Sequence, residues 1–248
     1  MVNLLISLSY DGTDYCGWVI QKKGKTIQGE LEKALKGITK NSEYKILGAS
    51  KTDSGVHALD QKVLVTIEFE PDLTRFSKAL NRALPSDIII NRIEKVSEDF
   101  NIRDVKQKTY KYVINDQQTN IFNQRFELDW RYGEINIEKL QEIFNCFIGE
   151  HEFKLFSGLT TEEMQLRKTY RKVDSIVVER SSTGKVEIIF KGKGFIRYQI
   201  RMIVGAALSA YQGKRISTSD IKNKLQGIGE KSTIVIEAKG LILEKIEF

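Results

Sequence analysis

The sequence predicts an α+β fold made of two halves, each with the element order β-α-β-β-α-β. Apolar residues recur at spacings that switch between two and about 3.6 residues, which is typical of strands alternating with amphipathic helices. This order of elements occurs twice along the 248 residues. A chain of this length with 41% hydrophobic residues can bury a core without disulfides or metals. Because β-α-β-β-α-β is the ferredoxin-like order, we expect two ferredoxin-like halves with antiparallel sheets.

The first half opens with a strand expected at residues 3–9 and a helix whose N-cap is Thr26. The apolar face of that helix comprises Ile27, Leu31, Ala34, Leu35 and Ile38. Further strands are expected at residues 44–49, 62–69 and 88–96, and residues 62–69 alternate in polarity as a half-buried strand does. A second helical stripe comprises Leu73, Phe76, Leu80 and Leu84, and Pro85 ends it.

The second half repeats the order, starting with a strand at residues 109–114. The apolar face of the helix that follows comprises Ile137, Leu140, Ile143, Phe144 and Phe147. Strands are expected at residues 173–179 and 186–191, joined by a turn at residues 181–184. The next helix carries Ile200, Ile203, Val204, Ala207, Leu208 and Tyr211 and is capped by Gly213, and residues 241–248 form the last strand.

The boundary between the halves is expected near residues 98–106. We therefore predict an N-terminal α+β domain of residues 1–102 and a C-terminal α+β domain of residues 103–248. No low-complexity linker separates them, so the halves should be packed rather than tethered. A central cleft between two such domains is the natural place for a functional site.

Composition narrows the class of protein. No apolar run is long enough to span a bilayer and no secretory leader is recognisable, so we expect a protein without a membrane segment that is not secreted. Cys16 and Cys146 form neither a disulfide framework nor a CxxC pair, which favours reduced thiols in the cytoplasm.

The net charge of +6 makes polyanions plausible partners. Composition alone favours the other interpretation, a lysine-rich surface that only keeps the protein soluble. The cations fall in three clusters: Arg103, Lys106, Lys108 and Lys111; Arg167, Lys168, Arg171 and Lys172; and Lys191, Lys193, Arg197 and Arg201.

The polar stretch GASKTDSGVHALDQK, at residues 48–62, allows several interpretations. The spacing of a phosphate-binding loop, G-x-x-x-x-G-K followed by Ser or Thr, is absent. Ser54, His57 and Asp60 are the residue types of a hydrolase triad, but no G-x-S-x-G elbow frames the serine. His57 and His151 have no metal-ligand spacing with the cysteines, so no metal site is expected.

Single residues also have ordinary structural interpretations. Asp53 in Asp-Ser-Gly is common turn chemistry. Tyr110 and Tyr112 on one face of a strand fit aromatic packing, and Arg201 in an apolar helix fits a charge that reaches the surface along its stem. Taken one by one, these residues do not decide a function.

Four spaced motifs occur in order along the chain: YDGTDYCGW followed by TIQGELEKAL, then GASKTDSGVHAL, then FNIR with KTYKYVI, and last GFIRYQIRMIVGAAL. Together they resemble the bacterial tRNA pseudouridine synthase A family. The first is similar to the family's Y-D-G-T-x-Y-x-G-W and the helix after it, and the second to G-R-T-D-A-G-V-H-A. The third is similar to F-H-A-R with R-x-Y-x-Y, and the fourth to F-L-H-H-M-V-R-N-I-V-G. Several motifs in the right order are more specific than any one of them.

The resemblance implies the pseudouridine synthase fold and isomerisation of uridine to pseudouridine in tRNA, at positions 38, 39 and 40 of the anticodon stem-loop. It makes Asp53 the catalytic aspartate, Tyr110 the active-site tyrosine and Arg201 the basic partner of the aspartate. It also implies a homodimer with a positively charged cleft. Because the reaction involves neither redox change nor net hydrolysis, no cofactor is expected. The RNA-binding residues that we predict are Lys51, Thr52, His57, Arg103, Lys108, Arg167, Lys168 and Arg197.

The sequence also departs from the family's motifs. Lys51 replaces an arginine, Ser54 an alanine and Val19 a glutamine, while Asn101-Ile102 replaces His-Ala and Tyr198-Gln199 replaces His-Met. Lys51 lacks the planar fork of arginine, so we hypothesise that the chemistry is retained while the RNA contacts are retuned, as in a divergent paralogue. The alternatives are the same reaction on ribosomal RNA or another uridine, a non-catalytic RNA-binding protein, and, more remotely, a hydrolase built on Ser54 and His57.

Overall fold

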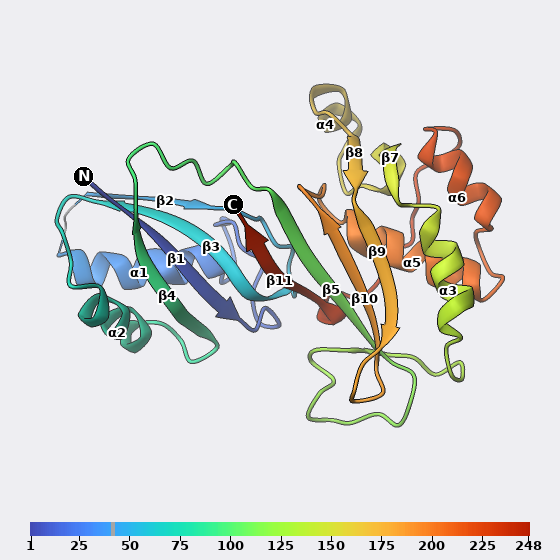
Figure 1. Ribbon diagram of the computed structural model, residues 1–248, viewed down its shortest axis with the longest axis horizontal. Helices are drawn as coiled ribbons and strands as arrows, with labels where there is room; N and C mark the ends of the chain where they lie inside the picture. Colours follow the sequence, from blue (N-terminus) through green and yellow to red (C-terminus); the bar gives the residue numbers. More distant parts are fainter. Residues whose placement is uncertain (41–42) are drawn as a thin grey trace. The chain divides into compact units, whose positions relative to one another are not determined.

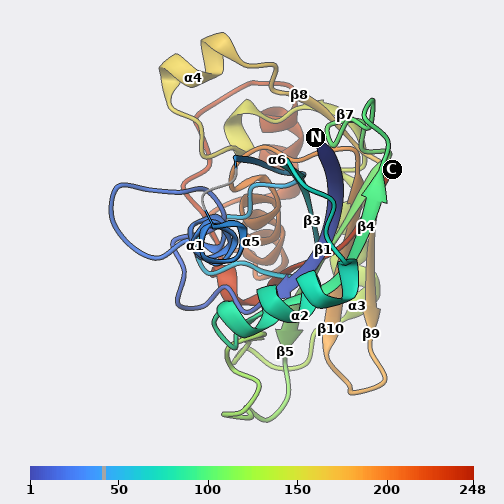
Figure 2. The same cartoon turned by 90° about the vertical axis from the view of Figure 1, so that its left-hand side faces the viewer.

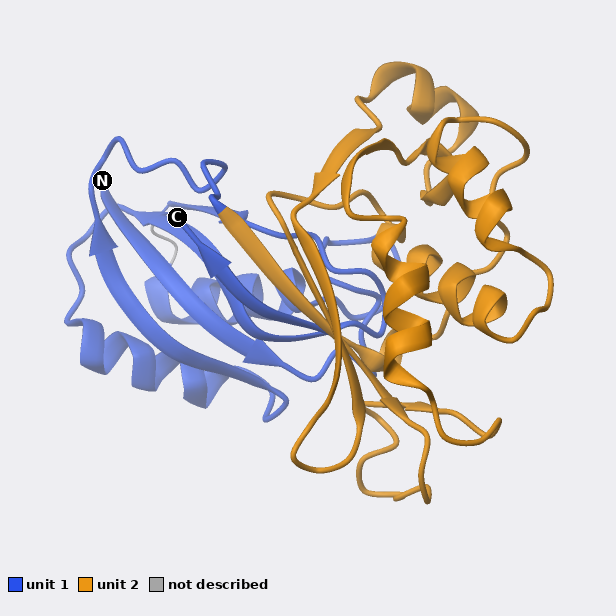
Figure 3. Cartoon of the chain, turned by 45° about the vertical axis from the view of Figure 1, so that its right-hand side comes forward, with its two compact units in different colours: residues 1–106, 242–248 blue, residues 107–241 orange. Residues whose placement is uncertain are grey.

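The computed structural model describes residues 1–40 and 43–248, which form two compact units (Figure 1). Unit 1 consists of Met1–Lys106 together with Ile242–Phe248, and unit 2 of Gln107–Leu241 (Figure 3). The chain passes from one unit to the other after Lys106 and returns at its last strand. Whether residues 1–102 and 103–248 are domains in their own right stays a prediction.

Unit 1 contains β1 (Val2–Tyr10), α1 (Ile27–Thr39), β2 (Tyr44–Gly48), β3 (His57–Ile67), α2 (Leu73–Ala83) and β4 (Ile88–Val96). The strands lie in the order β4-β1-β3-β2, and all three pairs are antiparallel. The helices α1 and α2 pack against each other on one side of this sheet (Figure 2). The β-α-β-β-α-β order predicted for the first half is therefore confirmed.

Local signals explain these elements. The side chain of Thr26 accepts a hydrogen bond from the Gly29 backbone N–H and so starts α1 as predicted. Asp72 does the same for α2 by accepting from the Arg75 N–H. The core of unit 1 is formed by β1 and the inner face of α1, whose fully buried side chains include Leu4, Ile6, Leu8, Ile27, Leu31 and Leu35.

The last strand, β11 (Leu241–Glu247), pairs in parallel with β3, with Ile242 opposite His57. Both β2 and β11 pair with β3, β2 along residues 63–67 and β11 at residues 57–58. The long strand β3 is thus contacted at its first residues by the end of the chain. The segment that precedes β3 is held from both of its ends by sheet structure.

Unit 2 begins with β5 (Gln107–Asn115), which pairs with β10 (Val186–Gly192), and β10 pairs with β9 (Ser175–Arg180), both antiparallel. Its main helices are α3 (Ile137–Asn145) and α5 (Gln199–Tyr211), which contact each other. These are the elements predicted from periodicity. The others are short: β6 (Leu128–Asp129), β7 (Gly149–Glu152), β8 (Tyr170–Val173), α4 (Thr161–Leu166), α6 (Thr218–Leu225), and single turns at Lys154–Phe156 and Ala238–Gly240.

Two expectations about the elements need correction. The strand expected at residues 62–69 begins at His57 and ends at Ile67, and Phe69 lies outside it. The register between β1 and β3 shifts between Leu8 and Tyr10, which disrupts the alternation of buried and exposed residues that marks a strand. The short elements β6, β7, β8, α4 and α6 were not expected, since elements of two to eight residues are too short to show a clear period.

Within residues 1–40 and 43–248, no helix combines the length and apolar character needed to cross a membrane.

Candidate active site

Asp53 lies on the loop between β2 and β3, in a tight turn. The backbone N–H of Val56 donates to the carbonyl oxygen of Asp53 at 3.2 Å. Gly55 has φ = 75°, a conformation that glycine adopts at little cost. Asp53 itself is half-buried. The turn therefore presents a carboxylate from a backbone whose path is fixed by hydrogen bonding.

A buried amide anchors the start of this loop. The Gln61 side chain is fully buried. Its Nε2 donates to the Ser50 carbonyl at 2.8 Å, and its Oε1 accepts from the Ser50 N–H at 3.2 Å. The neighbouring Ala49 N–H donates to the Lys62 carbonyl at 2.8 Å. The loop is thus tied to β3 immediately before it reaches Asp53.

The segment after β1, which contains the YDGTDYCGW motif, binds the same loop from another side. The Trp18 N–H donates to the Thr52 carbonyl at 3.0 Å, and the Tyr15 carbonyl accepts from the Gly55 N–H at 3.3 Å and from Ser54 Oγ at 3.1 Å. Tyr10 Oη and Thr52 Oγ1 are 2.7 Å apart. The first two sequence motifs are therefore joined by hydrogen bonds on both sides of Asp53, at Thr52 before it and at Ser54 and Gly55 after it.

Two glycines of the first motif allow this close approach. A β-carbon at Gly12 would lie 2.0 Å from the Val56 carbonyl oxygen, a separation that no side chain tolerates. A β-carbon at Gly17 would lie 2.7 Å from the Thr52 carbonyl oxygen and 3.0 Å from the Asp53 carbonyl carbon, and Gly17 has φ = 89°. Gly12 requires glycine for space, and Gly17 requires it for both space and backbone conformation.

His57 and Thr52, both predicted to contact RNA, point into the protein. His57 is 3% exposed and Thr52 is 7% exposed. His57 Nδ1 accepts from the Gly12 N–H at 3.1 Å and lies 3.1 Å from Asp11 Oδ1. Both side chains are buried among their partners and so support the loop, and their contact with RNA stays a prediction. Lys51, beside them, is exposed.

Tyr110 lies on β5 of unit 2 and is 7% exposed. Its ring meets Phe195 edge to face, with centroids 5.5 Å apart. Tyr112, two residues on, is fully buried, and its hydroxyl donates to the Glu237 carbonyl at 2.8 Å. Burial, together with the negative charge of Glu237, raises the pKa of the Tyr112 phenol, so this tyrosine stays protonated. At the start of β5, burial lowers the pKa of Lys108 to about 8.

Arg201 lies on the first turns of α5, half-buried. Its Nε donates to the Ile236 carbonyl at 2.9 Å, and its guanidinium carbon is 5.1 Å from the centroid of the Tyr198 ring. One turn further on, a β-carbon at Gly205 would lie 2.8 Å from Ile234 Cγ2. Glycine at this position therefore lets residues 234–236 run close enough to α5 to bind Arg201.

The remaining predicted RNA contacts differ in their surroundings. Arg103 and Lys168 are exposed. Arg167 is exposed and lies 3.6 Å from Glu163. Arg197 is occupied within the protein, because its guanidinium binds Glu163 and the Gly158 carbonyl. Unit 1 thus carries Asp53, Lys51 and Arg103, whereas Tyr110, Arg201 and the other cations belong to unit 2.

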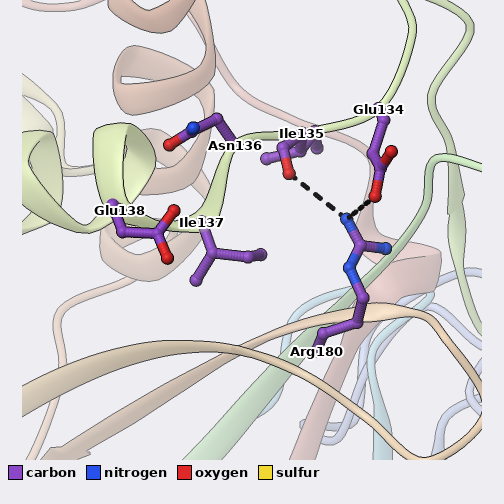
Figure 4. A pocket seen from close by; sticks show the side chains of 6 residues that line it. All are labelled: Glu134, Ile135, Asn136, Ile137, Glu138 and Arg180. Atoms are coloured by element: carbon purple, nitrogen blue, oxygen red, sulfur yellow. Dashed lines mark hydrogen bonds and ion pairs between the residues drawn. The ribbon is translucent and has the colours of Figure 1, made fainter.

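A pocket of about 330 Å³ at the start of α3 lies outside these motifs (Figure 4). Its one cation, Arg180, is already bound by Asp116 at 2.9 and 3.0 Å, by the Ile135 carbonyl at 3.2 Å and by Glu134 at 3.4 Å. Burial acts to raise the pKa of Asp116, but the hydrogen bonds from Arg180 and Ile135 and the charge of Arg180 outweigh it and hold that pKa below its usual range. Arg180 therefore fixes the structure of this region. Within the described part of the chain, no group of three or more His, Cys, Asp or Glu side chains is placed to hold a metal ion.

A family model described as tRNA pseudouridine synthase matches residues 6–103 and 143–248. The chain belongs to the tRNA pseudouridine synthase family. Asp53 lies in the first matched segment and Arg201 in the second. Tyr110 and Lys108 lie between the two segments, so their assignment depends on the K-T-Y-K-Y motif alone.

Relatives in this family match over nearly their whole length. The chain is 57% identical over 250 residues to the tRNA pseudouridine synthase A of Mesoplasma florum, covering all of this chain and 99% of the relative. It is 53% identical to that of Mycoplasma mycoides subsp. mycoides, covering 99% and 97%, and 45% identical to that of Spiroplasma kunkelii, covering 100% and 95%. A chain in the solved "Structure of H/ACA RNP bound to a substrate RNA containing 2'-deoxyuridine" matches 83% of this chain and 43% of its own length at 14% identity, and its TM-score of 0.39 is too low to bear on fold or function.

Membership of the tRNA pseudouridine synthase family confirms the resemblance read from the motifs, and the observed mixture of helices and strands confirms the α+β fold class predicted from periodicity. Sequence reasoning missed the supporting residues: Gln61, Gly158 and Glu163. Only Glu163 had a signal, since it follows Thr160 at the T-x-x-E spacing of a helix capping box. The sequence carries no signal for the ion pair between Glu163 and Arg197.

Proposed function

We propose that this protein isomerises uridine to pseudouridine in tRNA, at positions 38, 39 and 40 of the anticodon stem-loop. Membership of the tRNA pseudouridine synthase family supports the reaction and the class of RNA. The observation that carries the proposal is the enclosure of the Asp53 turn by the YDGTDYCGW segment, through hydrogen bonds from Trp18 to Thr52 and from Gly55 to Tyr15. The positions within tRNA come from the family resemblance of the motifs.

The reaction needs one positioned carboxylate and control of protons. The bond between N1 of the base and C1' of ribose breaks, the base turns, and a bond forms between C5 and C1'. The proton on C5 leaves and N1 gains a proton, so product and substrate have the same atoms and oxidation state. We assign to Asp53 the role of nucleophile or base, which requires its ionised form.

Arg201 and Tyr110 are the proposed partners of that carboxylate. A guanidinium is always charged and favours the ionised form of a neighbouring aspartate. The hydrogen bond from Arg201 Nε to the Ile236 carbonyl, at 2.9 Å, fixes one edge of the guanidinium. Tyr110 offers a ring for the extruded base and a hydroxyl that can take part in proton transfer at C5.

The substrate is held by its phosphates in this proposal. Lys51, Arg103, Lys108, Arg167 and Lys168 are the cations assigned to the RNA backbone, where contacts fix position without reading sequence. The target uridine must also leave the base stack of the folded RNA, and contacts to the phosphates hold the RNA in place while it does so. We further propose that the protein acts as a homodimer in the cytoplasm.

Lys51 favours one alternative substrate. Arginine grips a phosphate or base edge with two parallel hydrogen bonds, while lysine supplies a single mobile charge. A lysine at this exposed position beside Asp53 would weaken selection of one uridine. The second candidate function is accordingly the same isomerisation at another uridine or in ribosomal RNA.

Mapping the product on transcribed RNA tests the proposal. Purified protein is incubated with unmodified tRNA and ribosomal RNA transcripts, and pseudouridine is located by carbodiimide-blocked reverse transcription. We expect stops at positions 38 to 40 of tRNA, lost in Asp53→Asn and kept in Asp60→Asn, which alters a carboxylate on β3 that pairs with Lys62. Stops only at other positions would mean that the protein modifies a different uridine. RNA binding without any product would indicate a non-catalytic RNA-binding protein. Full activity confined to positions 38 to 40 would contradict the hypothesis that the RNA contacts are retuned.

A further inference from the structure

The start of α5 holds Tyr198 in a conformation that side chains rarely adopt. Tyr198 is the N-cap of the helix and has φ = 63°. A residue with a β-carbon stays in this left-handed region only where its surroundings hold it there. Arg201, the proposed partner of Asp53, follows one turn later. What holds Tyr198 therefore bears on where Arg201 points.

Gly158 and Arg197 provide the first restraint. The Gly158 N–H donates to the Arg197 carbonyl at 2.7 Å, and Arg197 Nε donates back to the Gly158 carbonyl at 2.9 Å. Arg197 Nη2 donates to the same carbonyl. A β-carbon at Gly158 would lie 2.4 Å from Cδ2 of Tyr198, so the glycine backbone lies directly against the ring.

Glu163, on α4, forms an ion pair with Arg197. Arg197 Nη2 lies 2.6 Å from Glu163 Oε2, and Nη1 lies 3.4 Å from Oε1, a two-pronged ion pair. Glu163 Oε2 also accepts from the Thr160 N–H at 2.9 Å in the capping box of α4. Since α4 has no buried residue, packing does little to hold this helix in place. The ion pair connects it to the residue beside Tyr198.

Tyr198 passes this restraint to Arg201. The Tyr198 carbonyl accepts from the Met202 N–H at 2.9 Å, which begins the helical hydrogen bonding around Arg201. The Tyr198 ring lies beneath the Arg201 guanidinium, 5.1 Å from ring centroid to guanidinium carbon. With Nε held by Ile236 on the other side, the ring is the second contact that sets the direction of the guanidinium.

We propose that Arg197 and Glu163 are positioning residues for the isomerisation, and that they act through the Tyr198 turn to aim Arg201. This inference rests on the proposed function. It assigns to Arg197 a role inside the protein in place of the RNA contact predicted from its charge. The family pattern F-L-H-H-M-V-R has histidines where this chain has Arg197 and Tyr198, and a histidine cannot form a two-pronged pair with a carboxylate. We call the contacts among Gly158, Glu163 and Arg197 the clamp.

Glu163→Gln is the variant that tests the clamp, with Glu162→Gln as its matched control. Glu162 is a carboxylate on the same helix whose side chain bonds to Thr160. Steady-state kinetics on tRNA, tRNA affinity and thermal melting are measured for both. We expect kcat of Glu163→Gln to fall about 10-fold, as a misaimed catalytic group predicts, with KM and tRNA affinity within about twofold of wild type. Glu162→Gln should keep its kcat.

A double-mutant cycle with Arg201→Lys separates positioning from general damage. If Glu163 acts through Arg201, Glu163→Gln should add little to the loss already caused by Arg201→Lys. Fully additive losses would overturn the proposal, as would a raised KM with an unchanged kcat, which is the pattern of a plain RNA contact. If the wild type is active and Glu163→Gln has normal kinetics, this inference is wrong while the proposed function stands. If the wild type forms no pseudouridine, both the proposed function and this inference are wrong.

Discussion

Gly17 lies against the backbone of Asp53, so closely that a β-carbon at Gly17 would be 3.0 Å from the Asp53 carbonyl carbon. The glycine belongs to the YDGTDYCGW segment and the aspartate to the loop between β2 and β3. Two stretches that are separate in sequence are therefore parts of one support. The placement of the proposed catalytic carboxylate depends on the absence of a side chain at a distant position.

Gly17→Ala should disturb that support. The added methyl group would meet the Thr52 carbonyl at 2.7 Å, and alanine at φ = 89° is strained. We expect a loss of about 1–3 kcal/mol in the free energy of unfolding and a clear loss of activity. Urea unfolding and single-turnover kinetics measure the two effects. Gly37→Ala in α1 is the control, because nothing lies within 4 Å of its β-carbon position, and it should gain up to about 1 kcal/mol. Equal behaviour of the two variants would refute this account.

Gly205→Ala should misplace Arg201. Helix propensity favours alanine by about 1 kcal/mol, but the new β-carbon would lie 2.8 Å from Ile234 Cγ2 and 3.3 Å from the Ile234 carbonyl oxygen. The segment that binds Arg201 Nε must then move away from α5. We expect kcat on tRNA to fall several-fold while KM changes little. A variant that gains stability like Gly37→Ala and keeps its kcat would show that this segment does not aim Arg201.

Lys108 should give the enzyme a pH dependence. Burial lowers the pKa of its ammonium to about 8, against an ordinary 10.5. Between these values the unfolded chain binds more protons than the folded one, so the penalty of burying the charge is present below pH 8 and disappears as the pH rises to 10.5. Stability measured by urea unfolding should therefore rise with pH across this window.

The same deprotonation removes a cation proposed to bind RNA. The value of kcat/KM for tRNA should fall as the pH rises through 8, and Lys108→Arg should flatten that fall because arginine keeps its charge. Parallel pH profiles for wild type and Lys108→Arg would exclude Lys108 as the cause.

Lys51 tests the hypothesis of retuned RNA contacts. Lys51 is exposed, while its neighbour Thr52 is held by Tyr10 and Trp18, so substitutions at 51 should leave the loop intact. We expect Lys51→Met to lower kcat/KM for tRNA about 10-fold and Lys51→Arg to narrow the set of modified uridines. An unchanged product map in Lys51→Arg would mean that this lysine does not set substrate choice.

Periodicity predicted the long elements well and the loop residues poorly. The strand at Ile88–Val96 and the helix started by Thr26 lie where the pattern put them, because burial of one face imposes the period. The start of β3 was missed because Leu59 is 52% exposed in a bulged region, which breaks the alternation. No local pattern marks such a bulge.

The candidate site shows the same division. The motifs identified Asp53 and the glycines around it, since each was part of a quoted pattern. They could not show that Thr52 and His57 are buried, because a polar side chain that satisfies a loop has the same sequence signature as one that faces solvent. They also could not show that Glu163 binds Arg197, since that ion pair joins α4 to the turn before α5 and has no sequence spacing of its own.

The central claim is that the carboxylate of Asp53 carries the chemistry. Single-turnover formation of pseudouridine in unmodified tRNA, measured for wild type and Asp53→Asn with tRNA affinity determined in parallel, tests it most directly. Asparagine keeps the size and the turn but cannot act as a charged nucleophile or base. We predict a rate loss of at least about 10³-fold with tRNA affinity within a few-fold of wild type. An Asp53→Asn enzyme that forms pseudouridine at close to the wild-type rate would contradict the account.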